Sequence, residues 1–162
     1  MRQTLAFIAL TLALMMGLSK ASGEPLPSGL SVTGYRITDI PPERSDTLYP
    51  QCGNGWYSQI NYTWDYEQNL FADCGWDSFM LHYKGFITIP ENVNSVRFAI
   101  ASDDGSDVTI DGKNFGNWTD KGCSIDYSDR YQLDTNTPLK LDAWFYENGG
   151  GCLLYTSDAA DD

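Results

Sequence analysis

Three aspartates lie close together in the stretch AIASDDGSDVTIDG, residues 99–112, namely Asp103, Asp104 and Asp107. Neighbouring carboxylates repel one another when both are ionised, so their placement in one short segment needs a physical reason. One reason is conformational, because Asp and Gly favour tight turns. Another is chemical, since carboxylate oxygens suit a hard cation such as Ca2+, and two carboxylates about 5 to 9.5 Å apart can cleave glycosides.

Other catalytic signatures are missing from the sequence. It contains no G-x-S-x-G, no H-E-x-x-H and no phosphate-binding glycine loop. The single histidine, His82, lies within an apolar segment, where we expect a packed or surface side chain rather than a base. No second carboxylate stands out as a catalytic partner for Asp103 or Asp104. We therefore predict that the protein is not an enzyme, with glycosidase chemistry as the one catalytic alternative.

The chain is acidic, with a formal net charge of −12 at pH 7. This charge disfavours binding to nucleic acid and to anionic membrane surfaces. Metal cations and neutral ligands remain as partners.

The N-terminal segment has the pattern of a secretory signal peptide. Arg2 precedes the apolar run LAFIALTLALMMGL and the small residues SKASG. A membrane anchor is the alternative, but the apolar run is short for a bilayer span, which takes about 20 residues. We predict a signal peptide over residues 1–23, no membrane span after its removal, and a secreted or cell-surface protein in an oxidising compartment.

The C-terminal segment CLLYTSDAADD, residues 152–162, follows no strand or turn pattern. It matches in register the translation of a common transposase sequencing adapter. An ordinary acidic tail is the alternative. We predict that residues 152–162 are not native, and that residues 24–151 form one domain that is truncated at its C-terminal end.

The cysteines are expected to form disulfides. With Cys152 assigned to the adapter, an odd number remains, namely Cys52, Cys74 and Cys123. Cys52 and Cys74 flank an aromatic-rich loop that their disulfide would close, which leaves the partner of Cys123 unidentified. Zinc is the alternative ligand, but no two of these cysteines have a C-x-x-C spacing.

The hydrophobic pattern has a period of two rather than 3.6 residues. Apolar residues alternate with polar ones in SVRFAIA (95–101) and PLKLDAWFYE (138–147), and FMLHYKGFITIP (79–90) continues the pattern with a change of phase near Gly85 that suggests a bulge. In DVTIDGKNFG (107–116), the Asp-Gly pair is typical of a two-residue hairpin turn. We predict an all-β protein, an antiparallel β-sandwich or barrel.

The run GFITIPENVNSVRFAIASDDGSDVTIDGKNFGNW, residues 85–118, resembles the β-sandwich module first named from the anthrax toxin protective antigen. The resemblance is carried by Ser-Asp-Asp-Gly-Ser at 102–106, Ile-Asp-Gly at 110–112 and Asn-Trp at 117–118. It covers residues 77–151 well and the preceding part of the domain less well. Yeast flocculins, other cell-surface adhesins and some bacterial glycosidases contain this module, which implies an antiparallel β-sandwich.

The resemblance implies a role for the aspartate pair. In the sugar-binding members, two adjacent aspartates are joined by a cis peptide and hold a calcium ion that takes two sugar hydroxyls. Asp103 and Asp104 match this pair, and Asp107 is expected to be a solvated strand residue. The loop FYENGGG (145–151) matches the second half of the site, with Asn148 as a side-chain ligand and Gly149 and Gly150 as ligand-binding positions whose backbone oxygens can approach closely.

Several aromatic and asparagine residues are further candidates. Trp118 would stack on the sugar or, alternatively, would be buried. An aromatic cluster in the inserted loop would be a binding surface if exposed and a small core if buried. The aromatic cluster consists of Trp56, Tyr57, Trp64 and Trp76. The two N-glycosylation sequons begin at Asn61 and Asn117.

Taken together, the sequence predicts a secreted, calcium-dependent carbohydrate-binding module of the lectin or adhesin type. The alternative is a non-catalytic structural or protein-interaction module of a larger extracellular protein or glycosidase. The sugar is not specified by the sequence.

Overall fold

The computed structural model describes residues 29–64, 71–89, 93–132, 138–150 and 152–159. Within these residues the chain forms strands and no helix, so the all-β prediction is confirmed. None of the described residues belongs to a helix long and apolar enough to cross a membrane. The segment assigned to the signal peptide lies outside the described residues.

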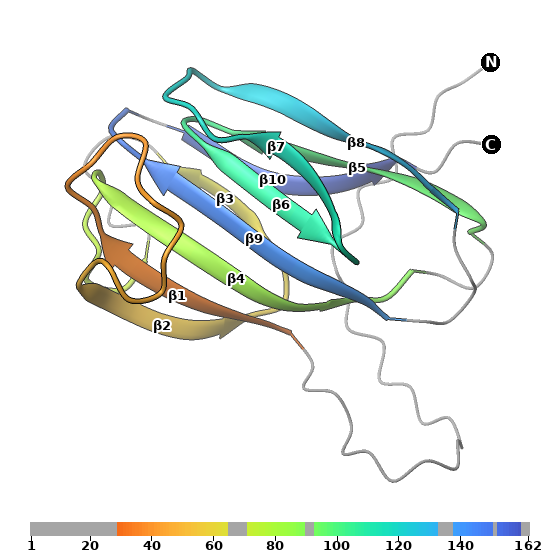
Figure 1. The fold of residues 1–162 in the computed structure, drawn as a ribbon, viewed down its shortest axis with the longest axis horizontal. Coiled ribbons are helices and arrows are strands. Elements are labelled where there is room, and N and C mark those ends of the chain that lie inside the picture. The colour runs from red at the N-terminus through yellow and green to blue at the C-terminus, as the bar shows by residue number, and fades with distance from the viewer. Residues whose placement is uncertain (1–28, 65–70, 90–92, 133–137, 151, 160–162) are drawn as a thin grey trace, which may run out of the picture.

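The strands form two antiparallel sheets that pack as the layers of a sandwich (Figure 1). The larger sheet has the order β2-β1-β4-β9-β6-β7, and the smaller has the order β3-β10-β5-β8. The strands are β1 (Leu30–Arg36), β2 (Gln51–Tyr57), β3 (Asn61–Trp64), β4 (Phe79–Ile87), β5 (Ser95–Ser102), β6 (Ser106–Ile110), β7 (Lys113–Asn117), β8 (Ser124–Gln132), β9 (Leu139–Glu147) and β10 (Cys152–Ala159).

The main core lies between the two sheets and is built by the alternation seen in the sequence. Every second residue of β5 and β9 faces inward, and the opposite residues point away from the core. The inward residues of these two strands are Val96, Phe98, Ile100, Leu139, Leu141, Ala143 and Phe145. The predicted inward alternation of apolar residues is therefore confirmed in these strands.

The hairpin between β6 and β7 also agrees with the prediction. Asp111 and Gly112 have φ angles of 49° and 82°, which a two-residue turn of this kind requires. The bulge expected at Gly85 is wrong, because β4 keeps an unbroken register with both β1 and β9. A Cβ at Gly85 would lie 2.8 Å from the carbonyl oxygen of Gly29, so the glycine permits close approach of the backbones.

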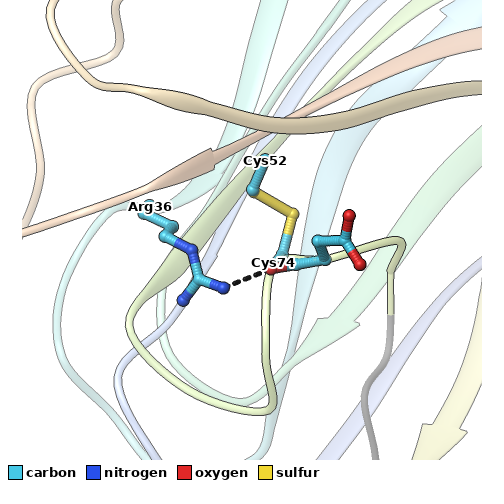
Figure 2. Close-up of a disulfide and its surroundings, with 4 residues drawn as sticks. Arg36, Cys52 and Cys74 are labelled. Atoms are coloured by element: carbon cyan, nitrogen blue, oxygen red, sulfur yellow. Dashed lines mark hydrogen bonds between the residues drawn. A yellow bond between two sulfur atoms is a disulfide. The ribbon is translucent and has the colours of Figure 1, made fainter.

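The disulfide between Cys52 and Cys74 is present, as predicted. It joins β2 to the loop that precedes β4, and the guanidinium of Arg36 donates a hydrogen bond to the carbonyl of Asp73 in the same loop (Figure 2). Cys123 is exposed and forms no disulfide with another cysteine in the described residues. Its partner stays unidentified.

A long loop, residues 38–50, crosses the outer face of the larger sheet, and we call it the strap (orange in Figure 1). Beneath and beside it lies a second apolar cluster, separate from the main core. The cluster consists of Tyr35, Ile37, Tyr49, Met80 and Tyr146, with Trp118 and Trp144 packed against them. The strap therefore covers part of a sheet face that would otherwise be open to solvent.

The C-terminal segment forms a strand that the sequence pattern did not predict. β10 pairs with β3 on one side and with β5 on the other, so it lies inside the smaller sheet. The expectation that this segment lacks strand structure is wrong. Its proposed adapter origin is a separate question and stays a prediction.

Candidate functional site

The Asp103-Asp104 turn joins β5 to β6 at the end of the larger sheet where β9 also ends. Ser106 pairs with Phe145, and the N–H of Tyr146 donates to the carbonyl of Gly105 at 2.9 Å. A Cβ on Gly105 would lie 2.1 Å from the Tyr146 ring, so only glycine allows the turn to lie against β9. The sheet topology therefore brings the aspartate pair and the loop after β9 to one place.

Asp104 is the centre of this arrangement. Its side chain is buried, with the residue 3 % exposed, and its backbone has a φ of 57°. One carboxylate oxygen accepts the N–H of Asn148 at 2.6 Å, and the other accepts the N–H of Lys121 at 3.3 Å. Asp104 also donates its own N–H to the carbonyl of Lys121 at 2.9 Å. Three segments thus meet at one carboxyl group.

The cis peptide implied for the aspartate pair is absent. Among the described residues the cis peptide bond is Ile40–Pro41, so the bond between Asp103 and Asp104 is trans. Asp103 is half-buried, and its Oδ1 accepts the N–H of Asp104 at 3.0 Å. The implied cis bond is therefore wrong, although the two residues lie on the predicted turn.

Asp120 also belongs to the site, although no pattern in the sequence pointed to it. Its carboxyl lies within hydrogen-bonding reach of Asp104, and the Asn148 side-chain amide donates to Asp120 Oδ2 at 3.3 Å. Burial, followed by the carboxyl of Asp120, raises the pKa of Asp104 to about 6, against the opposing N–H donors of Asn148 and Lys121. Asp120 lies in the loop after the β6–β7 hairpin and belongs to no recognisable sequence motif, so only the folded arrangement identifies it.

Glu147, the last residue of β9, is a second buried carboxyl that the sequence did not single out. The residue is 0 % exposed, and its Oε1 accepts the N–H of Gly149 at 2.8 Å. Its Oε2 has no hydrogen-bond partner among the described residues. Burial raises the pKa of Glu147 to about 8, and the charges of Asp104, Asp103 and Asp77 add to the effect.

We call Asp103, Asp104, Asp120 and Glu147 the acidic end. Among the described residues, no group of three or more His, Cys, Asp or Glu side chains is arranged as a ready metal cage. Calcium ligand sets, however, also include amide and main-chain carbonyl oxygens, and Asn148 and its glycine neighbours lie beside these carboxyls. Because Glu147 leaves one buried oxygen without a hydrogen bond, the donor chemistry of the acidic end fits a calcium ion.

The other predicted site residues have the following places. Asn148 and Gly149 are exposed, Gly150 is half-buried, and both glycines have positive φ angles of 149° and 122°. Asp107 forms an ion pair with Arg44 and accepts a hydrogen bond from Asn114, so its carboxylate is turned to the outer face of the sheet rather than to the acidic end.

Trp118 is half-buried next to the acidic end. Its indole N–H donates to the carbonyl of Pro42 in the strap at 2.8 Å, and its ring meets Tyr146 edge to face with centroids 4.8 Å apart. The Arg44 guanidinium lies 5.5 Å from the ring centroid. These contacts support the packed alternative for this residue, and sugar stacking stays a prediction.

His82 lies under the strap with both ring nitrogens occupied. Nδ1 is 2.7 Å from Asp46 and Nε2 is 2.9 Å from Asp142, and the ring stacks on Trp144 at 3.5 Å. Lys84 also contacts Asp46, at 2.6 Å. We call Asp46, His82, Lys84 and Asp142 the strap cluster. His82 is a packed side chain, as expected, and has no nitrogen available to act as a base.

The inserted aromatic residues whose side chains the structure describes differ in exposure. Trp56 is 63 % exposed and Trp76 is 37 % exposed, whereas Tyr57 packs against Phe71. The side chain of Trp64 lies outside the described residues. Both sequon asparagines, Asn61 and Asn117, are exposed, so either could be reached for glycosylation.

No family model matches the sequence, and no curated protein matches it. Solved structures do. The PA14 domain of the antifreeze protein MpAFP superposes with a TM-score of 0.64 at 15% identity, and the match covers 90% of this chain and 88% of that chain. The chain has the PA14 fold.

Two further similar structures are adhesin domains, one described as sugar-binding and one in complex with a disaccharide. The PA14 sugar-binding domain of an RTX adhesin matches with a TM-score of 0.57 at 12% identity, over 81% of this chain and 89% of that one. The A domain of epithelial adhesin 9 from Candida glabrata, in complex with Galβ1-4GlcNAc, matches with a TM-score of 0.62 at 11% identity, over 85% and 84% of the two chains.

The PA14 fold also occurs as part of longer chains. Two anti-sigma factor domain-containing proteins match with TM-scores of 0.70 and 0.68, and this chain spans 44% and 48% of their lengths. An α-xylosidase from Xanthomonas citri and a β-glucosidase from Kluyveromyces marxianus match over 14% and 16% of their chains. At these identities, all below 25%, the likeness establishes the fold and not the activity.

Proposed function

We propose that this PA14-fold domain is a non-catalytic carbohydrate-binding module whose sugar site depends on calcium. The observation that carries the proposal is the meeting of Asp104, Asp120 and Asn148 at the end of the larger sheet. In the described residues neither aspartate forms an ion pair with a lysine, arginine or histidine. A cation would offset the burial and the nearby Asp120 carboxyl, which together raise the pKa of Asp104 to about 6.

The residues that would hold calcium come from three segments. Asp103 and Asp104 supply carboxylates from the turn after β5, and Asp120 supplies another from the loop after β7. Asn148 supplies an amide oxygen, and Gly149 and Gly150 leave main-chain oxygens open to close approach. When bound, calcium would offer its remaining coordination positions to vicinal hydroxyls of a sugar.

The charge of the acidic end favours a neutral sugar. The carboxylates of Asp103, Asp104 and Asp120 exceed the charge of one divalent cation, and the charge of the whole chain, −12, has the same sign. Sialylated, sulfated or uronic-acid glycans would meet net repulsion. The neutral galactoside in the adhesin 9 structure is a ligand of this chemical type.

An extracellular setting supports the same function. The Cys52–Cys74 disulfide requires an oxidising compartment, and the predicted signal peptide over residues 1–23 would deliver the chain there. A glycan on Asn117 would lie close in sequence to Asp120 and would crowd the sugar site. We therefore expect Asn117 to be unmodified in sugar-binding protein.

The second candidate function is a structural or protein-interaction module without calcium. One observation favours it, because Asp104 already accepts main-chain N–H groups of Asn148 and Lys121. In this alternative the carboxylate ties three loops together and needs no cation. The two functions differ in their response to chelator.

A glycan screen with matched variants tests the proposal. The full chain and its D104N variant would be applied to arrays of neutral and acidic glycans in calcium and in EDTA. D129N is the control, because Asp129 is exposed on β8 and its loss changes the net charge by the same amount. We expect neutral-glycan binding by the full chain and D129N in calcium only, and none by D104N. Binding that survives both EDTA and D104N would contradict the calcium site.

A further inference from the structure

Glu147 is a fully buried acid in a place where the fold has no need of one. It ends β9 and pairs with Phe79 of β4, so it lies inside the larger sheet at 0 % exposure. Among the described residues no lysine, arginine or histidine forms an ion pair with it. A buried carboxyl without a cationic partner is costly to a fold.

The two oxygens of Glu147 have different surroundings. Oε1 accepts the N–H of Gly149 at 2.8 Å and so fixes the start of the loop that carries Asn148. Oε2 is buried and accepts no hydrogen bond from any described residue. The charged groups that act on this carboxyl are Asp104, Asp103 and Asp77, all of the same sign. A glutamine would serve the Gly149 contact equally well, so that contact does not explain the acid.

We propose that Glu147 is a further anionic group of the cation site, one that sets its affinity through the charge of the carboxylate. This inference rests on the proposed calcium-dependent function and extends it to a residue that the Asp103-Asp104 motif does not include. A hard cation gains from each additional carboxylate in or next to its ligand set. A calcium site that includes the Glu147 carboxylate would bind calcium in the absence of sugar, and not only together with it.

Calorimetric titration of CaCl2 into the full chain tests the role of the charge. The E147Q variant keeps the size of the side chain and an oxygen for the Gly149 N–H, and it replaces the charged carboxylate by a neutral amide with an NH2 group in place of Oε2. The D129N variant is the control for net charge. We expect the calcium dissociation constant to rise at least tenfold in E147Q and to stay within twofold of the wild-type value in D129N. Equal calcium affinity in E147Q and wild type would overturn the inference.

A measurement on the wild-type chain covers the case in which E147Q does not fold. With 13C-labelled glutamate carboxyls, the assigned Glu147 resonance should move as calcium is added, whereas that of Glu43 on the strap should not. A Glu147 signal that stays fixed at saturating calcium would also overturn the inference. If the wild-type chain takes up no calcium in either experiment, the proposed function fails as well. If it takes up calcium without involving Glu147, only this inference fails.

Discussion

The strap cluster and the acidic end use the same kinds of residue and have opposite electrostatic balance. In the strap cluster, Asp46 is contacted by Lys84, His82 and the hydroxyl of Tyr35. Burial alone would raise the pKa of Asp46, but hydrogen bonds from these three side chains hold it well below its usual range. In the acidic end, burial and neighbouring carboxyls raise the pKa of Asp104 to about 6 and that of Glu147 to about 8.

The contrast separates a structural cluster from a candidate site. Carboxylates that are matched by protein cations tie the strap to the sheet and have nothing further to bind. The carboxyls of Asp104 and Glu147 accept main-chain N–H groups and lie near other carboxyls, so their charge is unfavourable, and a ligand cation can neutralise it. The carboxyls of the acidic end are therefore where we expect a ligand to raise stability.

The largest loss of stability is expected for H82A, which disrupts the strap cluster. H82A leaves Asp46 and Asp142 without the imidazole between them and removes the stack on Trp144. The loss of two side-chain hydrogen bonds and of a buried, stacked ring should cost about 3 kcal/mol in urea unfolding. K84A, at an exposed position of the same cluster, should cost less than about 1 kcal/mol. A loss in H82A no greater than that in K84A would refute the structural role of the cluster.

The next effect removes charge from the acidic end. Without calcium, D104N should change the free energy of unfolding little, because relief of the repulsion with Asp120 is offset by one N–H, of Asn148 or Lys121, that then faces the amide NH2. In calcium at 100 times its dissociation constant, the wild type should gain about 2.7 kcal/mol, and D104N should gain almost nothing. Chemical unfolding in calcium and in EDTA measures both quantities. A gain of the same size in D104N would show that calcium binds elsewhere.

The pH dependence of stability should differ between the two regions. Folded-state pKa values of about 6 for Asp104 and about 8 for Glu147 exceed the ordinary values of 3.8 and 4.5, so both groups favour folding when protonated. In EDTA their contribution is fully present below about pH 4 and is lost as the pH rises to about 8. Asp46 has the opposite sign, so its contribution is lost on acidification below about pH 4.

The double variant D104N/E147Q isolates the acidic end in that experiment. Its stability in EDTA should vary less between pH 4 and pH 8 than that of the wild type. The acid-side loss due to the strap cluster should persist. Parallel curves for wild type and double variant across this range would contradict the assignment.

The smallest expected effect concerns the link between the two regions. Trp118 joins the strap to the acidic end through its hydrogen bond to Pro42 and its contact with Tyr146. W118F keeps a ring and loses the N–H donor, so unfolding should become easier by about 1 kcal/mol. Glycan affinity in calcium should stay within twofold if the ring only packs. A loss of glycan binding out of proportion to the loss of stability would instead identify Trp118 as a stacking residue.

Local pattern in the sequence was sufficient for several strands of both sheets. Alternation in β5 and β9 identified their buried faces, and the Asp111-Gly112 pair identified the hairpin, because both signals depend on residues next to each other in the chain. The Cys52–Cys74 pairing followed from a small number of cysteines. The aspartate turn was identified from a motif, although the implied cis peptide was wrong.

The remaining features depend on contacts between residues far apart in the chain. Asp120 and Glu147 join the site only because β9 lies between β4 and β6 and ends beside the turn after β5. The partners of His82 come from the strap and from β9, neither of which is near it in sequence. β10 was missed since its segment lacks an alternating pattern, and its pairing comes from β3 and β5. Charge balance at a site is likewise visible only once the fold is known.

A thermal melt of the wild-type chain in calcium and in EDTA tests the central claim most directly. The claim is that Asp104, Asp120 and Glu147, which form no ion pair with a lysine, arginine or histidine among the described residues, belong to a site that calcium completes. Because such an ion binds the folded state only, we predict a melting temperature that rises with calcium concentration, and a clearly smaller rise with magnesium, which demands a smaller octahedral site. Identical melting temperatures in calcium and EDTA, at calcium concentrations up to several millimolar, would contradict the account.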